Sequence, residues 1–193
     1  MKLILASKSP RRRQILGEMG YTFEVLVAEC DESYAHTLSP REGVELLAQR
    51  KGAAVADAYG LTQDVNSVIL SSDTLVDLDG VALGKPVDEE DAFRMLRSLS
   101  GNTHSVFTGV AVLGSEGLDL RSEESRVTFR EMSDEEIRGY IATGEPMDKA
   151  GAYGVQGRGA VFVEHLDGDF FNVMGLPLCT LAQMLKQQGV KVF

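Results

Sequence analysis

The stretch Leu3 to Arg13, which reads LILASKSPRRR, constrains the fold more than any other part of this sequence. Residues 2–6 have the apolar character of a short buried strand. Ser9 is a favourable N-cap, and Pro10 suits the first helical position, where a missing backbone N–H costs nothing. The sequence therefore predicts a strand that passes through a small polar turn into a helix.

This predicted turn is a candidate site for an anion. Backbone N–H groups at the start of a helix favour negative charge, and four cationic side chains belong to the same stretch: Lys8, Arg11, Arg12 and Arg13. Arginine offers a fork for phosphate oxygens, and lysine offers a point charge. The turn is not a P-loop, because the glycines of GxxxxGK[ST] are absent. Two interpretations stay open: a phosphate cradle, or a capped surface helix with a solvated basic patch.

The charge of the chain gives weight to this turn. The 193 residues carry a formal net charge of −10, so we expect neither nucleic acid nor an anionic membrane surface as a partner. An anion must then be bound locally, by a basic cluster, a metal ion or both. With 44% hydrophobic residues, the chain can form one substantial core, and we predict a single domain over residues 1–193.

The two cysteines indicate a reducing compartment. Cys30 and Cys179 are far apart and form no CxxC motif, so neither a disulfide scaffold nor a zinc site is expected. No apolar run reaches the length of a transmembrane helix. We therefore expect a cytoplasmic protein with reduced thiols.

An acidic residue accompanies the most buried strand. Residues 68–76 begin with a continuous apolar run, as expected for a strand covered on both faces, and Asp73 follows that run. A carboxylate there is costly unless it is paired, hydrogen-bonded or metal-bound, so Asp73 is a functional candidate, with a structural role as the alternative. Glu32 lies in an acidic cluster just after another predicted strand. Lys51, inside a predicted helix, reads on its own as a solvated lysine.

Residues 148–159 form a glycine-rich segment. Four glycines between 151 and 159 indicate a backbone that something approaches closely, and Gln156 carries an amide suited to a planar edge such as that of a base. The alternative is a loop shaped only by turn geometry. Lys85, between Gly84 and Pro86, is a weaker candidate.

The remaining capping and periodicity signals predict an α/β domain with a mixed sheet. Helices are expected from Pro10 to about Met19 and at 40–59, 89–99, 134–143 and 177–188, and strands at 2–6, 23–27, 68–76, 105–113 and 125–129. An Asp-Gly hairpin is expected after residue 76, and a second hairpin between 160–165 and 170–173.

Taken together, these pieces resemble the Maf family of nucleoside triphosphate pyrophosphatases over essentially the whole chain. No single motif is specific, but their order and spacing are. The motifs are Ala6–Arg12, Asp31-Glu32, Lys51, Ser72-Asp73-Thr74, Gly84-Lys85-Pro86, Leu99-Ser100-Gly101, Lys149–Gly157 and Val173–Pro177.

The resemblance implies hydrolysis of a nucleoside triphosphate between its α and β phosphates, which gives a monophosphate and pyrophosphate. It implies a divalent metal, Mg²⁺ or Mn²⁺, and a homodimer. The implied fold is a strongly twisted mixed β-sheet flanked by helices with a central cleft, similar to inosine triphosphatase-like folds.

The resemblance also implies a substrate. One branch of the family prefers dTTP and UTP and carries an Arg, a Thr and a Gln, which match Arg11, Thr74 and Gln156. A second branch acts on 7-methyl-GTP and carries other residues there. Ser72 departs from the usual Ala, and Arg13 extends the basic turn.

Roles for individual residues follow from the same resemblance. The expected substrate contacts, besides the specificity trio, are Ser7, Ser9 and Arg12, and the expected catalytic residues are Asp73, Glu32, Lys51 and Lys85. Glu32 and Asp73 would hold the metal, for which carboxylates suit Mg²⁺ or Mn²⁺ better than Zn²⁺. Asp73 is also the family's proposed proton acceptor. Two other functions stay open, a non-catalytic nucleotide-binding regulator of cell division and a phosphatase acting on the terminal phosphate.

Overall fold

The computed structural model describes residues 1–33 and 38–191, and the chain forms two compact units. The first unit consists of Met1–Asp73, Thr108–Glu123 and Gly175–Phe193, and the second of Thr74–Phe107 and Glu124–Met174. Three strands contribute residues to both units, so the prediction of a single domain over residues 1–193 stays open.

The elements of the first unit are β1 (Lys2–Leu5), α1 (Pro10–Glu18), β2 (Phe23–Val25), α2 (Pro40–Ala58) and α6 (Leu178–Gln187). The second unit contains β4 (Val81–Leu83), α3 (Glu89–Leu99), α4 (Asp134–Ile141), the 3₁₀ turns η1 (Glu145–Asp148), η2 (Ala150–Ala152) and η3 (Arg158–Phe162), β7 (Val163–Asp167) and α5 (Phe170–Val173). The shared strands are β3 (Ser67–Leu78), β5 (Thr103–Gly114) and β6 (Gly117–Phe129).

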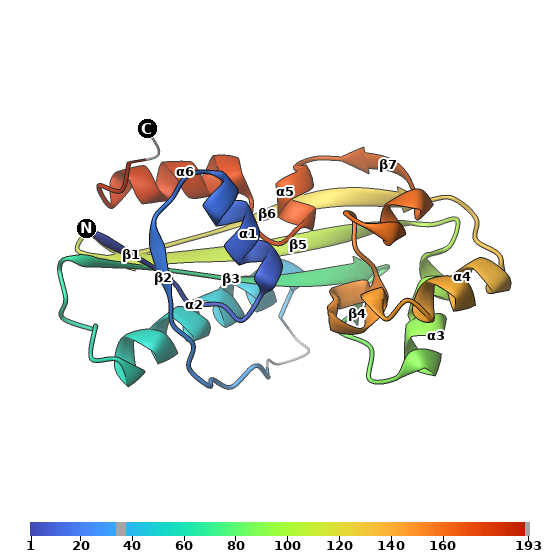
Figure 1. Cartoon of the computed structure of the whole chain (residues 1–193), viewed down its shortest axis with the longest axis horizontal. Coiled ribbons are helices and arrows are strands. Elements are labelled where there is room, and N and C mark those ends of the chain that lie inside the picture. The colour runs from blue at the N-terminus through green and yellow to red at the C-terminus, as the bar shows by residue number, and fades with distance from the viewer. Residues whose placement is uncertain (34–37, 192–193) are drawn as a thin grey trace. The chain divides into compact units, whose positions relative to one another are not determined.

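The described strands form one mixed sheet (Figure 1). Their order is β2-β1-β3-β5-β6-β7, and β4 pairs with β3. β1 pairs in parallel with β2 and β3, whereas β3 with β4 and β6 with β7 are antiparallel. Together with the helices, this arrangement confirms the predicted α/β fold with a mixed sheet.

The helix starts follow the capping signals of the sequence. Ser9 caps α1, and Ser39 and Ser133 cap α2 and α4 with complete capping boxes. Asp88 caps α3 by accepting the backbone N–H of Asp91 at 2.7 Å. These local hydrogen bonds satisfy backbone donors that the helix leaves free, which explains why the starts could be predicted.

The core of the first unit lies on both faces of β1 and β3. Ile4, Ala6 and Ile69 point toward Val55 and Ala56 of α2. The alternating residues Leu3, Leu5, Val68 and Leu70 are equally buried. Figure 1 shows α2 and α6 on opposite sides of these strands. Both faces are therefore covered, as the continuous apolar run of β3 predicted.

The second unit has an aromatic core around a histidine. His104 of β5 is buried, and its Nε2 lies 2.8 Å from the hydroxyl of Tyr153. Both rings meet Phe129 edge to face, at centroid distances of 5.2 and 4.7 Å. Tyr153 belongs to the glycine-rich segment, so this cluster attaches that segment to the sheet.

β3 runs from Ser67 to Leu78 and contains the strand predicted at residues 68–76, with Asp73 inside it. The hairpin predicted between 160–165 and 170–173 is wrong, since β7 pairs with β6 and residues 170–173 form α5. Polar side chains favour this helix: Asp169 accepts the N–H of Phe171 at 2.8 Å, and the Asn172 amide donates to the Val106 carbonyl at 3.0 Å. Among the described helices, none has the length and apolar character needed to cross a bilayer.

Acid should weaken the second unit through His104. Burial lowers the pKa of His104 to about 4, from 6.5 in the unfolded chain. The unfolded state therefore takes up a proton first, and the stability contributed by the neutral ring is lost as the pH falls from 6.5 toward 4. Between pH 7 and pH 4.5, we expect the free energy of unfolding to fall by about 2 to 3 kcal/mol more in the wild type than in His104→Phe.

Urea denaturation at the two pH values measures this difference. His104→Phe also removes the hydrogen-bond partner of the Tyr153 hydroxyl, which lowers the stability of the variant at both pH values. The quantity to compare is therefore the change in the free energy of unfolding between the two pH values. Equal pH dependence in the two proteins would show that His104 does not titrate as its burial requires.

Candidate active site

The turn between β1 and α1 has the predicted form. The Ser9 hydroxyl accepts the N–H of Arg12 at 3.4 Å, and the Ser7 hydroxyl accepts the N–H of Ser9 at 3.1 Å. Both serines are half-buried, and Pro10 begins the helix. The predicted strand, turn and helix are therefore confirmed, with Ser7 and Ser9 at the N-terminal end of α1.

Arg12 fixes this turn to the rest of the first unit. Its Nε donates to the carbonyl of Gly175 at 2.8 Å, and its Nη1 donates to the carbonyl of Ser72 at 2.7 Å. The Ser72 hydroxyl donates to the same Gly175 carbonyl at 2.9 Å. Burial lowers the pKa of Arg12, and the charge of Asp73 opposes that effect. Arg12 thus holds α1 against the residue next to Asp73. The hydroxyl of Ser72, which stands where the Maf family usually has Ala, is satisfied by its hydrogen bond to Gly175.

The packing of α2 on β3 delivers a lysine to Asp73. The Ser71 hydroxyl donates to the carbonyl of Ala48 at 2.7 Å. A Cβ at Gly52 would come within 2.7 Å of the same hydroxyl oxygen, so glycine is required for this close approach. Lys51 lies between these two contacts in the helix. Its side chain is thereby placed beside the middle of β3.

Lys51 joins the two predicted carboxylates. Its Nζ lies 2.6 Å from Asp73 Oδ1 and 3.0 Å from Glu32 Oε2. The Asp73 side chain is only 14% exposed, whereas that of Glu32 is 66% exposed. Burial alone would lower the pKa of Lys51, but the charge of Asp73 and the hydrogen bonds to both carboxylates outweigh it, and the pKa is raised. Lys51 is therefore the ammonium ion that compensates a buried carboxylate.

The segment that carries Glu32 is held by the neighbouring arginine of α2. Arg50 Nη1 donates to the carbonyl of Ser33 at 2.5 Å and to that of Asp31 at 3.3 Å. Consecutive residues of α2 thus hold the backbone and the side chains of this acidic segment. Of the predicted basic cluster, Lys8 pairs with Glu29 at 2.7 Å on the surface.

Glu32 and Asp73 are the two predicted carboxylates to be tested against a metal ion. In residues 1–33 and 38–191, no group of three or more His, Cys, Asp and Glu side chains could hold a metal ion. Mg²⁺, however, is commonly bound by one or two carboxylates together with substrate phosphates and water. Two carboxylates that already share one cation, Lys51, fit such a metal if it binds together with a phosphorylated substrate.

Three other predicted residues, Thr74, Lys85 and Gln156, belong to the second unit. Thr74 follows Asp73 in β3 and is half-buried, while Lys85 and Gln156 are exposed. The N–H of Gly151 donates to the carbonyl of Gly84 at 3.0 Å, which places the Gly-Lys-Pro triplet beside the glycine-rich segment. The structure thus brings together Ser7, Ser9, Arg12, Glu32, Lys51 and Asp73 in one unit. Arg11, at the first turn of α1, is half-buried.

Three residues that position this site, Ser71, Gly52 and Gly175, carry no local signal that predicts this role. Gly175 lies in the motif 173–177 that carries the family resemblance, which was the only signal for it. The role of Ser71 depends on a helix 23 residues away, and nothing local marks it.

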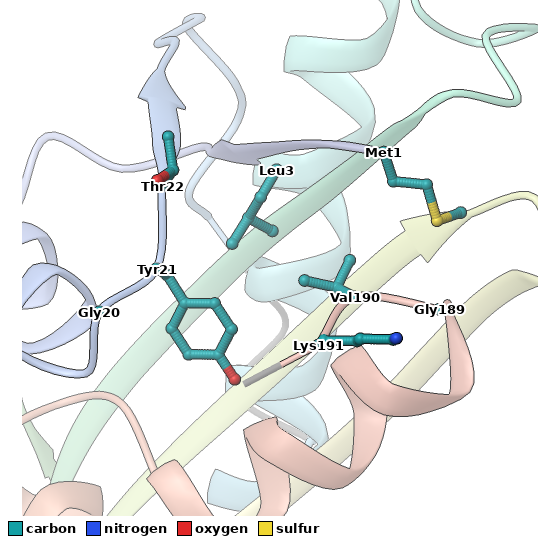
Figure 2. A pocket seen from close by; sticks show the side chains of 8 residues that line it. All are labelled: Met1, Leu3, Gly20, Tyr21, Thr22, Gly189, Val190 and Lys191. Carbon is teal, nitrogen blue, oxygen red and sulfur yellow. The ribbon is translucent and has the colours of Figure 1, made fainter. Parts of the chain in front are cut away.

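A separate pocket of about 330 Å³ lies at the other end of the first unit (Figure 2). Met1, Tyr21, Gly189 and Lys191 contribute to its lining, and none of the predicted site residues does. The Tyr21 hydroxyl has no hydrogen-bond partner among the described residues, and burial raises the pKa of Tyr21. This pocket is therefore distinct from the candidate active site.

The fold and the site define an α/β protein with a capped, arginine-anchored helix start beside a lysine–carboxylate cluster. Comparison with known proteins then assigns the family. The model of the family described as Maf-like protein matches residues 2–188, and the chain belongs to the Maf family.

Curated relatives cover the full chain. A protein of Geobacillus sp. (strain WCH70) named dTTP/UTP pyrophosphatase is 50% identical over 97% of this chain and 98% of its own length. Proteins of the same name from Pelotomaculum thermopropionicum and Hahella chejuensis are 49% and 46% identical, over 99% and 100% of this chain and 98% and 94% of their own. The solved structure of the Staphylococcus aureus Ham1 protein is 15% identical, with a TM-score of 0.46 over 67% of this chain and 72% of that one. That similarity is too distant to support an inference.

Replacing Arg12 should cost stability, because its guanidinium holds two main-chain carbonyls at once. Lysine cannot reproduce the fork, so we expect Arg12→Lys to lower the free energy of unfolding by about 1 to 3 kcal/mol. The exposed neighbour gives a matched control, and Arg13→Lys should stay within about 0.5 kcal/mol of the wild type. Urea denaturation measures both. Equal stability of the two variants would show that the hydrogen bonds from Arg12 to the two carbonyls do not stabilise the fold.

Proposed function

We propose that this protein is a nucleoside triphosphate pyrophosphatase that hydrolyses dTTP and UTP to the monophosphate and pyrophosphate. The observation that carries the proposal is the Lys51 ammonium held between Asp73 and Glu32, in the same unit as a helix N-terminus anchored by Arg12. The substrate is taken from the full-length relatives, which are named dTTP/UTP pyrophosphatases.

The triphosphate is assigned to the cationic and N–H groups of the chain. Phosphoryl transfer needs chiefly positioning and charge neutralisation. The N-terminal end of α1, with Ser7 and Ser9, supplies backbone and hydroxyl groups for phosphate oxygens. Arg12 keeps this end in place, and Lys51 and Lys85 supply further positive charge.

Asp73 is assigned the role of accepting a proton from the attacking water. Its side chain is 14% exposed, and one of its carboxylate oxygens is paired with Lys51. Once Lys51 has moved to a phosphate oxygen, the carboxylate can accept a proton from water. Glu32 and Asp73 would hold Mg²⁺ or Mn²⁺. When bound, such an ion neutralises phosphate charge and lowers the pKa of a water molecule. Lys51 would then be released from the two carboxylates to contact phosphate.

Base recognition is assigned to Arg11, Thr74 and Gln156. The Gln156 amide carries one donor and one acceptor group and can pair with the O4 and N3–H edge that uracil and thymine share. That edge does not include the 5-methyl group, which accounts for one enzyme accepting both UTP and dTTP. Cytosine presents an amino donor and a ring acceptor instead, so CTP should be a poor substrate.

Assembly as a homodimer in the cytoplasm is part of this proposal. The homodimer rests on the family resemblance. The two cysteines, Cys30 and Cys179, are both free thiols, which fits a reducing compartment.

Product analysis tests the proposed function. We expect purified protein with Mg²⁺ or Mn²⁺ to convert UTP and dTTP to UMP and dTMP plus pyrophosphate, and excess EDTA to stop turnover. Orthophosphate as the product would indicate a phosphatase, and turnover of 7-methyl-GTP alone would indicate the other branch of the family. Binding of nucleotides without any turnover would favour the regulator.

Two variants belong in the same assay. Asp73→Asn should abolish turnover and remain folded, because the amide keeps the shape but accepts no proton. Asp57→Asn makes the same change at an exposed residue whose carboxylate accepts the Thr62 hydroxyl, and it should behave as wild type. Turnover of Asp73→Asn within about tenfold of the wild type, a barrier change of only about 1.4 kcal/mol, would remove Asp73 from the catalytic role.

A further inference from the structure

Two side chains of the second unit hold the backbone on either side of Gln156. The hydroxyl of Tyr140, near the end of α4, accepts the N–H of Gly154 at 3.1 Å. The carboxylate of Glu145, at the start of η1, accepts the N–H groups of Arg158 and Gly159, both at 3.1 Å. The anchored positions thus lie two residues before Gln156 and two and three residues after it. We call residues 154–159 the Gln156 loop.

The two anchoring side chains are themselves linked. The Tyr140 hydroxyl donates to Glu145 Oε1 at 2.9 Å, so one oxygen accepts a hydroxyl and the N–H of Gly159. The ammonium of Lys149 donates to the backbone carbonyl of Glu145 at 2.5 Å, and its side chain is only 12% exposed. Tyr140 is buried and Glu145 is half-buried. Together, Tyr140 and Glu145 form a clamp on the Gln156 loop.

The glycines of the loop fit this clamp. Gly157 has φ +90°, and a Cβ there would lie 3.0 Å from Glu145 Oε2. A Cβ at Gly159 would lie 2.6 Å from the Tyr140 hydroxyl oxygen. The close approach that the glycine-rich sequence predicted is therefore made by these two side chains of the protein itself.

The carboxylate is charged when it forms the clamp. Burial tends to raise the pKa of Glu145, but the N–H groups of Arg158 and Gly159 and the Tyr140 hydroxyl stabilise the charged form, and the pKa is lowered. Hydrogen bonds to a charged acceptor are stronger than those between neutral groups. The clamp can therefore hold a loop that has few side chains of its own to pack.

We propose that Glu145 and Tyr140 are positioning residues for base recognition, which fix the backbone of the Gln156 loop and so the point from which the Gln156 side chain reaches the base. This inference rests on the proposed function, in which Gln156 reads the base. A mobile backbone would have to be ordered each time Gln156 pairs with a base. A backbone that is already held on both sides lowers this entropic cost, so the pairing contributes more to binding.

Glu145→Gln tests the proposal. The variant keeps the size of the side chain, but its NH₂ group replaces one acceptor oxygen and meets an N–H or hydroxyl donor of the clamp. We expect the ratio of kcat/KM for UTP to that for CTP to fall by about tenfold, mainly through a higher KM for UTP, because one charge-assisted hydrogen bond is lost. This ratio does not depend on the fraction of folded enzyme, so a merely structural defect would not change it.

Three further variants complete the experiment. Glu124→Gln makes the same change at an exposed carboxylate of this unit, which accepts the Ser105 hydroxyl at 2.9 Å, and it should keep the wild-type ratio. Tyr140→Phe should lower the ratio, and combining it with Glu145→Gln should add less than the sum of the two effects, because both act on one clamp. Gln156→Ala should lower the ratio at least as far as Glu145→Gln.

The outcomes separate this inference from the proposed function. An unchanged ratio in Glu145→Gln, with a lowered ratio in Gln156→Ala, would overturn the clamp and leave the pyrophosphatase in place. An unchanged ratio in Gln156→Ala would overturn it as well, because the loop would then not read the base. Wild-type protein that cleaves neither UTP nor dTTP would instead overturn the proposed function, and the clamp's role in recognition with it.

Discussion

The ion pair between Lys51 and Asp73 is the interaction on which the candidate site depends. Asp73 lies inside a 12-residue strand in which the six residues before it, Ser67–Ser72, are buried, and an uncompensated carboxylate there would be costly. The Lys51 ammonium compensates its charge from a distance of 2.6 Å. This ion pair forms because α2 packs close to β3, through the hydroxyl of Ser71 and the missing side chain of Gly52. The Asp73 carboxylate and its counter-ion are therefore built into the core packing of the first unit.

The same charges explain how an acidic protein can bind a polyanion. The chain carries a net charge of −10, so its surface as a whole repels a triphosphate. Positive charge is instead concentrated at a few residues that are held in place, with Arg12 fixed by carbonyls and Lys51 by carboxylates. A polyanion can therefore be met by a few local positive charges, although the surface as a whole is negative.

Local signals in the sequence predicted the helix starts, the turn between β1 and α1, and the Asp-Gly hairpin, because each depends on residues a few positions apart. Features that depend on distant partners were not predictable in this way. The two carbonyls that hold Arg12 are 60 and 163 residues away in the sequence. Residues 170–173 became a helix because Asn172 bonds to Val106 and Ser125, which no window around them contains.

The site shows the same division. Asp73 was singled out by local reasoning, since a carboxylate beside a buried apolar run needs an explanation. Lys51 and Glu32 were raised above ordinary surface residues only by the family resemblance, and the structure then placed both against one another. The glycines of the Gln156 loop indicated a close approach, but Tyr140 and Glu145 could be identified only from coordinates.

The most direct test of this account is a crystal structure of the protein with Mn²⁺ and a UTP analogue whose α,β-bridging oxygen is replaced by a nitrogen. We expect an anomalous Mn²⁺ peak contacted by carboxylate oxygens of Glu32 and Asp73, with the Lys51 ammonium moved to a phosphate oxygen. A metal ion bound elsewhere, with Lys51 still paired to both carboxylates, would contradict it.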